Sequence, residues 1–303
     1  MRFKDLLFQQ VYQMATNFFP VRKYVGSSSK VGIIMLLCHR DLNMAFYSLK
    51  SFFFKQKCTL PIYIVSDGSL TAADRGRLES VFTVTFESGA DAISKVKQKF
   101  STYSWINRYL SDDKNSVKRL KLAAILLAPF KKNIVLEPDI LYYHFSPEVK
   151  QFTHSPQNFY GAMPKQIYEL GITENSTELH FRRLLNLHLK VTASDLFNGG
   201  VLLLNQKSLN KKLLNKLDEA TELIYSLDYA RMTYADETLT ALMFDSDNST
   251  VLNDKVYINY VSAAQYDRKK FMDSVYVHYM TGTRVRNMYD SIKMIFKTRF
   301  FSR

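Results

Sequence analysis

Two carboxylates that follow a short apolar run in the middle of the chain are the side chains best suited to chemistry. Residues 134–136 are β-branched or aliphatic and predict a buried strand. Glu137, Pro138 and Asp139 come next, and the strand should end there because proline cannot continue a β-ladder. Carboxylates two residues apart can point into one crevice and hold a divalent cation against a phosphate. The alternative is a solvated turn, in which acids and proline are also common.

Strands and helices alternate in the first half of the chain, and they would position these carboxylates. Strands are expected at 31–37, 61–65, 81–86 and 134–136, and helices at 42–55, 72–80, 91–110 and 116–127. This alternation predicts an α/β fold with a mostly parallel central sheet and helices on both faces. In such sheets ligands bind outside the carboxyl ends of the strands, which is where Glu137 and Asp139 would lie.

Three stretches in the second half carry further residues that could serve a site. Gly199 and Gly200 precede a buried strand, which indicates that the backbone approaches another group closely there. Asp236 and Glu237 open a helix, where the helix dipole favours acids, so capping alone could explain them. A late strand at 275–279 contains His278. The remaining expected elements are a strand at 159–163 and helices at 178–187 and 207–226.

The composition is that of a globular protein. Of the 303 residues 47% are hydrophobic, enough to bury a large core in one domain or in two modest ones. The longest apolar runs, 33–38 and 122–128, are too short to cross a bilayer, and the N-terminus lacks the pattern of a signal peptide. Cys38 and Cys58 are the only cysteines, too few for a disulfide framework or a zinc cluster. A cytoplasmic location is therefore expected.

The net charge of +13 is concentrated at the two ends of the chain. Both ends also carry apolar residues at helical spacing. We therefore expect an amphipathic helix and linker at 1–30, a single domain at 31–286 and an amphipathic tail at 287–303. Basic amphipathic ends fit an anionic membrane, such as the inner face of a cell membrane, better than nucleic acid. The alternative is that these stripes pack on the domain or on the second subunit of a homodimer.

Four of these pieces, in this order along the chain, resemble the nucleotide-sugar glycosyltransferases of the GT-A fold. The pieces are Arg119-Leu120 before Leu136-Glu137-Pro138-Asp139, then Phe197-Asn198-Gly199-Gly200-Val201, then Asp236-Glu237, and last His278-Tyr279-Met280-Thr281-Gly282-Thr283-Arg284. Family 8, which includes glycogenin and the bacterial lipooligosaccharide galactosyltransferases, is the family that they resemble most, over roughly residues 31–288. The resemblance implies transfer of a hexose from a UDP-sugar to a hydroxyl group of a glycan or a lipid-linked saccharide, with retention of configuration.

The resemblance also implies a metal site. Glu137, Asp139 and His278 would hold Mn²⁺ or Mg²⁺ against the diphosphate of the donor. The imidazole favours manganese, and the cation would act as a Lewis acid on the leaving diphosphate. Taken without the resemblance, a single histidine such as His278 is more often a hydrogen-bonded histidine of the core.

Further residues are implied to contact the rest of the donor and the acceptor. The base and ribose would rest against His39, Asp41 and Asp67, the nucleotide sugar against Arg119, the diphosphate against Gly282 and Arg284, and the donor sugar against Asn198 and Gly199. Asp236 and Glu237 would lie near the anomeric carbon or the acceptor hydroxyl. A guanidinium such as that of Arg119 suits paired phosphate or hydroxyl oxygens.

The chain departs from the family pattern at three places. Glu137 stands where the family has the first aspartate of Asp-x-Asp, which keeps a ligand but changes its reach. Glu237 stands where the family has glutamine, so inversion with Asp236 or Glu237 as general base is an alternative. The segment from His278 has one extra residue before Gly282 and one fewer after it, and it ends in arginine instead of lysine. A further alternative is a non-catalytic GT-A-like module that binds membrane or nucleic acid, which would have no need of three metal ligands.

Overall fold

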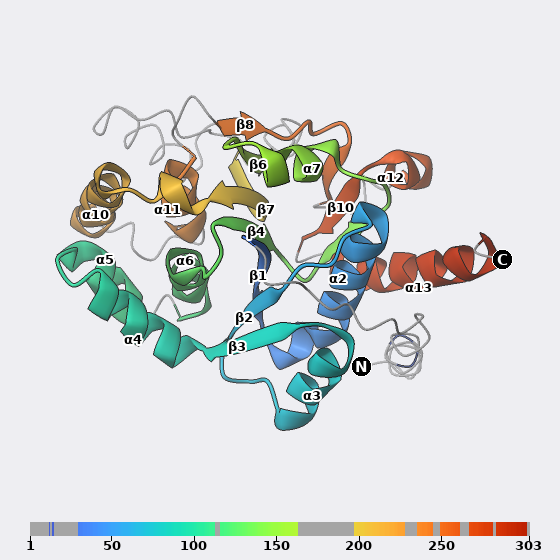
Figure 1. Ribbon diagram of the computed structural model, residues 1–303, viewed down its shortest axis with the longest axis horizontal. Helices are drawn as coiled ribbons and strands as arrows, with labels where there is room; N and C mark the ends of the chain where they lie inside the picture. Colours follow the sequence, from blue (N-terminus) through green and yellow to red (C-terminus); the bar gives the residue numbers. More distant parts are fainter. Residues whose placement is uncertain are drawn as a thin grey trace.

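A seven-stranded sheet forms the centre of the molecule (Figure 1). The computed structural model describes residues 12, 14, 30–112, 116–162, 197–227, 235–244, 249–260, 267–280 and 283–301. In spatial order the strands are β3 (Val84–Ser88), β2 (Ile62–Ser66), β1 (Val31–Leu37), β4 (Lys132–Leu136), β7 (Phe197–Asn205), β6 (Asn158–Ala162) and β8 (Ser249–Val251). The first four are parallel, β7 is antiparallel to both of its neighbours, and β8 is parallel to β6. The sheet is therefore mixed and mostly parallel, which confirms the predicted fold class.

Helices cover both faces of this sheet (Figure 1). One face carries α4 (Gly89–Lys99), α5 (Ser104–Ser111), α6 (Ser116–Leu127), α10 (Lys211–Ser226) and α11 (Ala235–Leu242), and the other carries α2 (Leu42–Gln56), α3 (Ala72–Val81) and α7 (Pro147–His154). Successive side chains of a strand point to opposite faces. Ile34 and Val135 therefore join the core under the first set of helices, whereas Ile33 and Ile134 join the core under the second. Burial on both faces explains why these strands are apolar at almost every position.

A second, three-stranded sheet brings the late part of the chain to the end of β4. Its strands are β5 (Ile140–Tyr142), β10 (Tyr276–Tyr279) and β9 (Tyr257–Tyr260), with β10 in the middle. β10 pairs antiparallel with β5, so that His278 lies opposite Ile140. The amide of Tyr279 also donates a hydrogen bond to the carbonyl of Asp139 at 2.9 Å. This pairing holds His278 beside the turn that carries Glu137 and Asp139.

Two serines of α2 hold the same turn from the other side. The Ser48 hydroxyl donates to the carbonyl of Glu137 at 3.1 Å, and the Ser51 hydroxyl accepts the amide of Tyr142 at 3.1 Å. Both serines are buried. Because buried backbone groups need partners, these hydroxyls fix the path of the chain from β4 into β5.

The first part of the C-terminal helix α13 (Arg284–Phe301) packs against the second sheet. Asn287 and Ser291 are fully buried, and Met294 belongs to the core cluster of that sheet. Met288 and Ile292, two apolar residues of the tail that was expected to face a membrane, pack against the same cluster. The predicted boundary at residue 287 therefore falls inside a helix of the folded unit.

Of the helix and linker expected at 1–30 the structure describes only Tyr12, Met14 and Lys30, and Tyr12 packs against this region. Its ring stacks on Tyr47 of α2 with centroids 4.6 Å apart, and its hydroxyl donates to Asn287 Oδ1 at 3.3 Å. The Tyr47 hydroxyl in turn donates to the carbonyl of Tyr12. Tyr12 is thus part of the junction between α2 and α13.

We expect the substitution Met294→Ala to lower the free energy of unfolding by about 2 kcal/mol, because truncating a buried methionine removes apolar contacts and leaves a cavity. Met294 is 8% exposed. The neighbouring Lys293 is exposed, so Lys293→Ala should change stability by less than about 0.5 kcal/mol. Urea unfolding of both variants measures the difference, and equal effects would contradict the packing of α13 on the second sheet.

Several elements differ from expectation. The single helix expected at 91–110 is two helices, because Asp218 Oδ1 accepts the amides of Trp105 and Ile106 and starts α5 separately. α7, α12 (Arg268–Asp273), β8 and β9 were not predicted. The helix expected at 178–187 lies outside the described residues. None of the helices that the structure describes combines the length and the apolar run that crossing a bilayer would take.

Candidate active site

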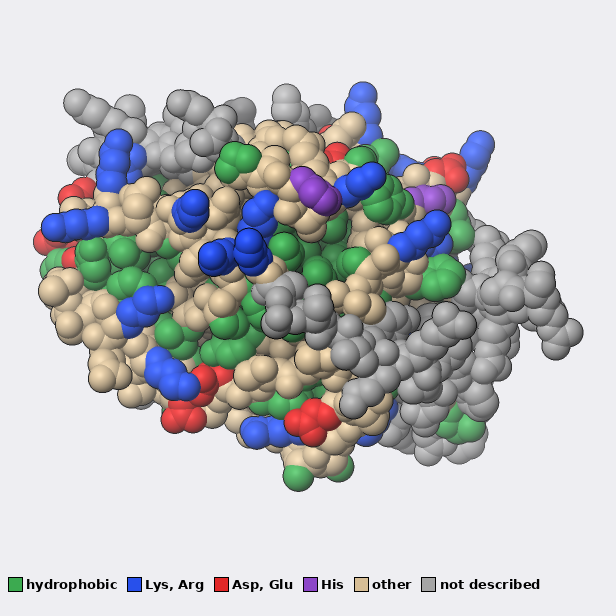
Figure 2. Space-filling view, in the orientation of Figure 1, with side chains coloured by type: hydrophobic (Ala, Val, Ile, Leu, Met, Phe, Trp, Pro, Cys, Tyr) green, Lys and Arg blue, Asp and Glu red, His purple; other side chains and the backbone are tan. Residues whose placement is uncertain are grey.

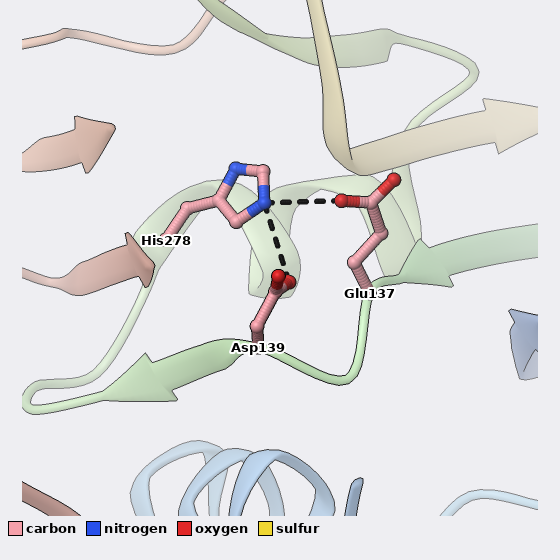
Figure 3. Close-up of side chains that lie close together, drawn as sticks. All are labelled: Glu137, Asp139 and His278. Atoms are coloured by element: carbon pink, nitrogen blue, oxygen red, sulfur yellow. Dashed lines mark ion pairs between the residues drawn. The ribbon is translucent and has the colours of Figure 1, made fainter. Parts of the chain in front are cut away.

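Glu137, Asp139 and His278 converge at the carboxyl end of β4 (Figure 3). Each offers one ligand atom, and these atoms lie within 4.8 Å of one another. His278 Nε2 is 3.0 Å from Glu137 Oε2 and 3.3 Å from Asp139 Oδ1. His278 and Asp139 are both 3% exposed, whereas Glu137 is partly open to the solvent. The β4–β5 turn supplies the two carboxylates, and β10 supplies the imidazole.

Two asparagine side chains orient the imidazole from behind. His278 Nδ1 lies 2.9 Å from Asn259 Oδ1 and 3.2 Å from Asn198 Oδ1. Asn198 Oδ1 also accepts the amide of Gly200 at 3.0 Å, which fixes it as an acceptor. Nδ1 therefore carries a proton and donates, and Nε2 is directed at the carboxylates. A histidine that binds a metal is typically oriented in this way by a partner on its other nitrogen.

Gly200 makes room for this imidazole. A Cβ at Gly200 would lie 2.5 Å from His278 Nδ1 and 2.6 Å from Cε1, closer than atoms can pack. The paired glycines were predicted to precede the strand, but they lie inside β7. The close approach inferred from them is an approach to the side chains of the site.

The donor set fits a hard divalent cation. Two carboxylates and one imidazole are ligands that Mn²⁺ and Mg²⁺ accept, and the imidazole favours Mn²⁺. In this structure the Lys121 ammonium and a protonated His278 balance the negative charge of the two carboxylates. Burial opposes a charged His278, but Asp139 and Glu137 raise its pKa to about 10. Burial likewise opposes a charged Glu137, but Lys121 and His278 hold the pKa of its carboxyl well below the usual range.

Lys121 is a site residue that the sequence patterns did not single out. Its Nζ lies 2.5 Å from Glu137 Oε1, and the residue is only 7% exposed. Burial disfavours its charge, but Glu137, Asp236 and Glu237 together keep its pKa above the ordinary value. The signal in the sequence was a lysine inside the apolar run 120–127, since a lysine is rarely buried without a partner.

A cleft of about 710 Å³ opens beside these residues at the carboxyl ends of β1, β2 and β4. Its lining includes Glu137, Asp139 and Lys121. The predicted residues His39, Asp41, Asp67 and Asp236 also line it. The structure therefore gathers residues from three strand ends and two helices around one cavity, as ligand sites in open α/β sheets are built.

His39, Asp41 and Asp67 form one rim of the cleft and contact neighbouring side chains. His39 Nδ1 is 2.7 Å from Asp74 Oδ2, at the first turn of α3. Arg40 Nε lies 3.1 Å from Asp41 Oδ1. Asp67 Oδ1 accepts both the amide and the hydroxyl of Ser69, at 2.9 and 2.6 Å. These contacts hold the rim in a defined shape.

Arg119 is not among the described residues that line the cleft. It donates to the carbonyl of Leu110 at 3.2 Å, on the side of α6 that faces α5. Positions two apart on a helix point in nearly opposite directions, whereas positions three apart share a face. Lys118 and Lys121 therefore face the cleft together.

Asp236 and Glu237 lie close enough to Lys121 to interact with its charge. Asp236 is 7% exposed, and burial raises the pKa of its carboxyl although Lys121 and Lys118 oppose the shift. A Cβ at Gly199 would lie 2.6 Å from Lys121 Nζ and 3.8 Å from Glu237 Cγ, so Gly199 leaves space for the ammonium. Gly282 lies outside the described residues, and Arg284 begins α13.

Comparison with known proteins finds this architecture in glycosyltransferases. Mouse xyloside xylosyltransferase 1 in its apo form superposes with a TM-score of 0.55 at 17% sequence identity, over 84% of this chain and 98% of that chain. The galactosyltransferase LgtC in complex with donor and acceptor sugar analogues superposes with a TM-score of 0.50 at 12% identity, over 87% and 95%. By sequence, no protein-family model and no curated protein matches the chain. The chain thus has the GT-A fold of nucleotide-sugar glycosyltransferases, as its sequence motifs implied.

Proposed function

We propose that the protein is a metal-dependent glycosyltransferase that moves a hexose from a UDP-sugar to a hydroxyl group of a glycan or a lipid-linked saccharide. The observation that carries this proposal is the convergence of Glu137, Asp139 and His278 Nε2 beside the cleft. A volume of about 710 Å³ lies in the range of small-molecule and cofactor sites. A module that only binds a surface has no use for such a ligand set in a cleft.

The residues divide into those that hold the donor and those that orient its reacting end. Glu137, Asp139 and His278 would hold Mn²⁺ or Mg²⁺, which when bound supplies Lewis-acid stabilisation of the leaving diphosphate. Lys121 adds positive charge on the same side of the cleft. Ammonium groups bind phosphate oxygens as point charges. The base and ribose would rest against the rim formed by His39, Asp41 and Asp67.

Two stereochemical outcomes are compatible with the acids at the start of α11. Retention is the outcome that the resemblance implies, with Asp236 and Glu237 beside the reacting sugar. Inversion is the second candidate, because burial raises the pKa of Asp236 and so moves it toward the range of a useful general base. The anomeric configuration of the product distinguishes the two.

The basic ends of the chain support docking on an anionic membrane, where a lipid-linked acceptor would be available. Met288, Ile292 and Met294 of α13 pack against the protein. Docking would therefore depend on exposed basic side chains such as Lys293 and on the segments before residue 30 and after residue 294. Each basic residue close to such a surface contributes about 1 kcal/mol, which salt screens.

The experiment that tests the proposed function is a panel of sugar nucleotides, including UDP-glucose, UDP-galactose, UDP-xylose and GDP-mannose, with and without Mn²⁺. We expect release of UDP from one UDP-sugar, its loss in EDTA and its recovery on addition of Mn²⁺. NMR of the new linkage then gives the stereochemistry, and Glu237→Gln should stay active if configuration is retained. A protein that binds and turns over none of these donors would support the non-catalytic alternative.

A further inference from the structure

Lys121 places a cation against one of the three metal-ligating residues. The two carboxylate oxygens of Glu137 have different partners. Oε1 lies 2.5 Å from Lys121 Nζ, and Oε2 lies 3.0 Å from His278 Nε2. The Lys121 side chain is 9% exposed, so water screens its charge weakly. A carboxylate that would serve as a metal ligand is therefore already neutralised by a group of the protein itself.

The surroundings of Lys121 are arranged for this ammonium. Gly199 lacks the Cβ that would lie 2.6 Å from Lys121 Nζ. Asp236 and Glu237 add two negative groups that favour the charged form. Lys121 also lines the cleft beside the carboxyl end of β4. The ammonium can therefore face either Glu137 or a ligand in the cleft without leaving its acidic surroundings.

We propose that Lys121 couples metal binding to donor binding. In the nucleotide-free protein its ammonium pairs with the Glu137 carboxylate and repels the metal cation. When a diphosphate enters the cleft, the ammonium turns to the phosphate oxygens and releases the Glu137 carboxylate as a ligand. Such coupling is reciprocal, so the diphosphate tightens metal binding by the same factor by which the metal tightens diphosphate binding. This inference rests on the proposed function, since it takes a nucleoside diphosphate as the ligand of the cleft.

Two neutral substitutions and one matched control test the coupling. Lys121→Met removes the ammonium, and Lys121→Gln removes it but keeps a group that can hydrogen-bond to Glu137, so that the carboxylate keeps a partner. Lys118→Met removes the same charge from the same face of α6. Lys118 lies near Asp236 and lines the cleft. Circular dichroism and thermal unfolding establish that each variant is folded before it is titrated.

The measurement is the affinity for Mn²⁺, from the EPR signal of the free ion, with and without saturating UDP. Without UDP we expect both Lys121 variants to bind Mn²⁺ about tenfold more tightly than the unchanged protein, within the range typical of coupled sites. The gain in Mn²⁺ affinity that UDP produces should fall by the same factor. Lys118→Met should change both quantities much less.

The outcomes separate this inference from the proposed function. If the Lys121 variants bind Mn²⁺ no more tightly without UDP, or keep the full gain with UDP, Lys121 does not couple the two sites and the inference is wrong. If Lys118→Met had an equal effect, the coupling would come from the general positive charge of the cleft and not from the Lys121–Glu137 pair, and the inference would also be wrong. If the unchanged protein binds neither Mn²⁺ nor UDP, the proposed function itself fails.

Discussion

Asp139→Asn should reduce donor turnover by roughly three orders of magnitude, because it removes an anionic ligand from the proposed metal site, whose cation supplies several kcal/mol of transition-state stabilisation. Asp139 is 3% exposed, and asparagine has nearly the same shape, so the fold should be kept. The measurement is kcat over a series of Mn²⁺ concentrations, together with the circular dichroism spectrum.

Asp254→Asn is the matched control for Asp139→Asn. Asp254 is an exposed acid in the turn between β8 and β9, and it has no part in the cleft. Its loss should leave kcat within about twofold, since surface substitutions rarely act at a distance. A folded Asp139→Asn protein that keeps full activity in EDTA would show that the chemistry does not depend on this carboxylate.

Gly200→Ala should weaken Mn²⁺ binding by about 10- to 100-fold, the range seen when a partner that orients a metal-bound histidine is lost. The added methyl group would lie 2.5 Å from His278 Nδ1, and the buried imidazole would have to leave Asn259 and turn Nε2 away from the carboxylates. Forcing a methyl group into this packed region should also lower the free energy of unfolding by about 1–3 kcal/mol. Mn²⁺ titration and urea unfolding measure the two effects.

Gly76→Ala provides a control of opposite sign. Gly76 lies within α3, and a Cβ there would have no atom within 4 Å. Because alanine favours helix over glycine, this variant should be more stable by about 0.5–1 kcal/mol and should bind Mn²⁺ unchanged. If Gly200→Ala bound Mn²⁺ as tightly as Gly76→Ala, His278 would not be a ligand in the observed orientation.

The elements whose patterns are local were predictable from the sequence. The strand at 31–37 and the helix at 116–127 have the boundaries that periodicity and turn residues indicated. Each is defined by apolar spacing over a few residues and is followed by turn or helix-ending residues, so no distant contact is needed to recognise it. The same holds for Glu137 and Asp139, whose place at a strand end follows from the proline between them.

Elements that depend on distant partners were not predictable in this way. The strand β9 is short and becomes a strand only because β10 pairs with it, which brings Asn259 to the imidazole. The C-terminal helix was expected as a membrane-facing tail. Its Met288 and Ile292 face the protein because the second sheet offers an apolar surface for them, and no local pattern distinguishes that surface from lipid.

The sequence by itself determined the fold class, the strand end that carries two carboxylates, and the motif that contains His278. Only the tertiary structure decided which basic residue of α6 meets them. Arg119 and Lys121 lie on the same helix, but α6 packs on β1 and β2 in a rotation that turns Lys121 to the cleft and Arg119 to Leu110. The apolar positions of α6 fix that rotation only against the surface of the folded sheet, because a helix is oriented by what it buries and not by the charges that it carries.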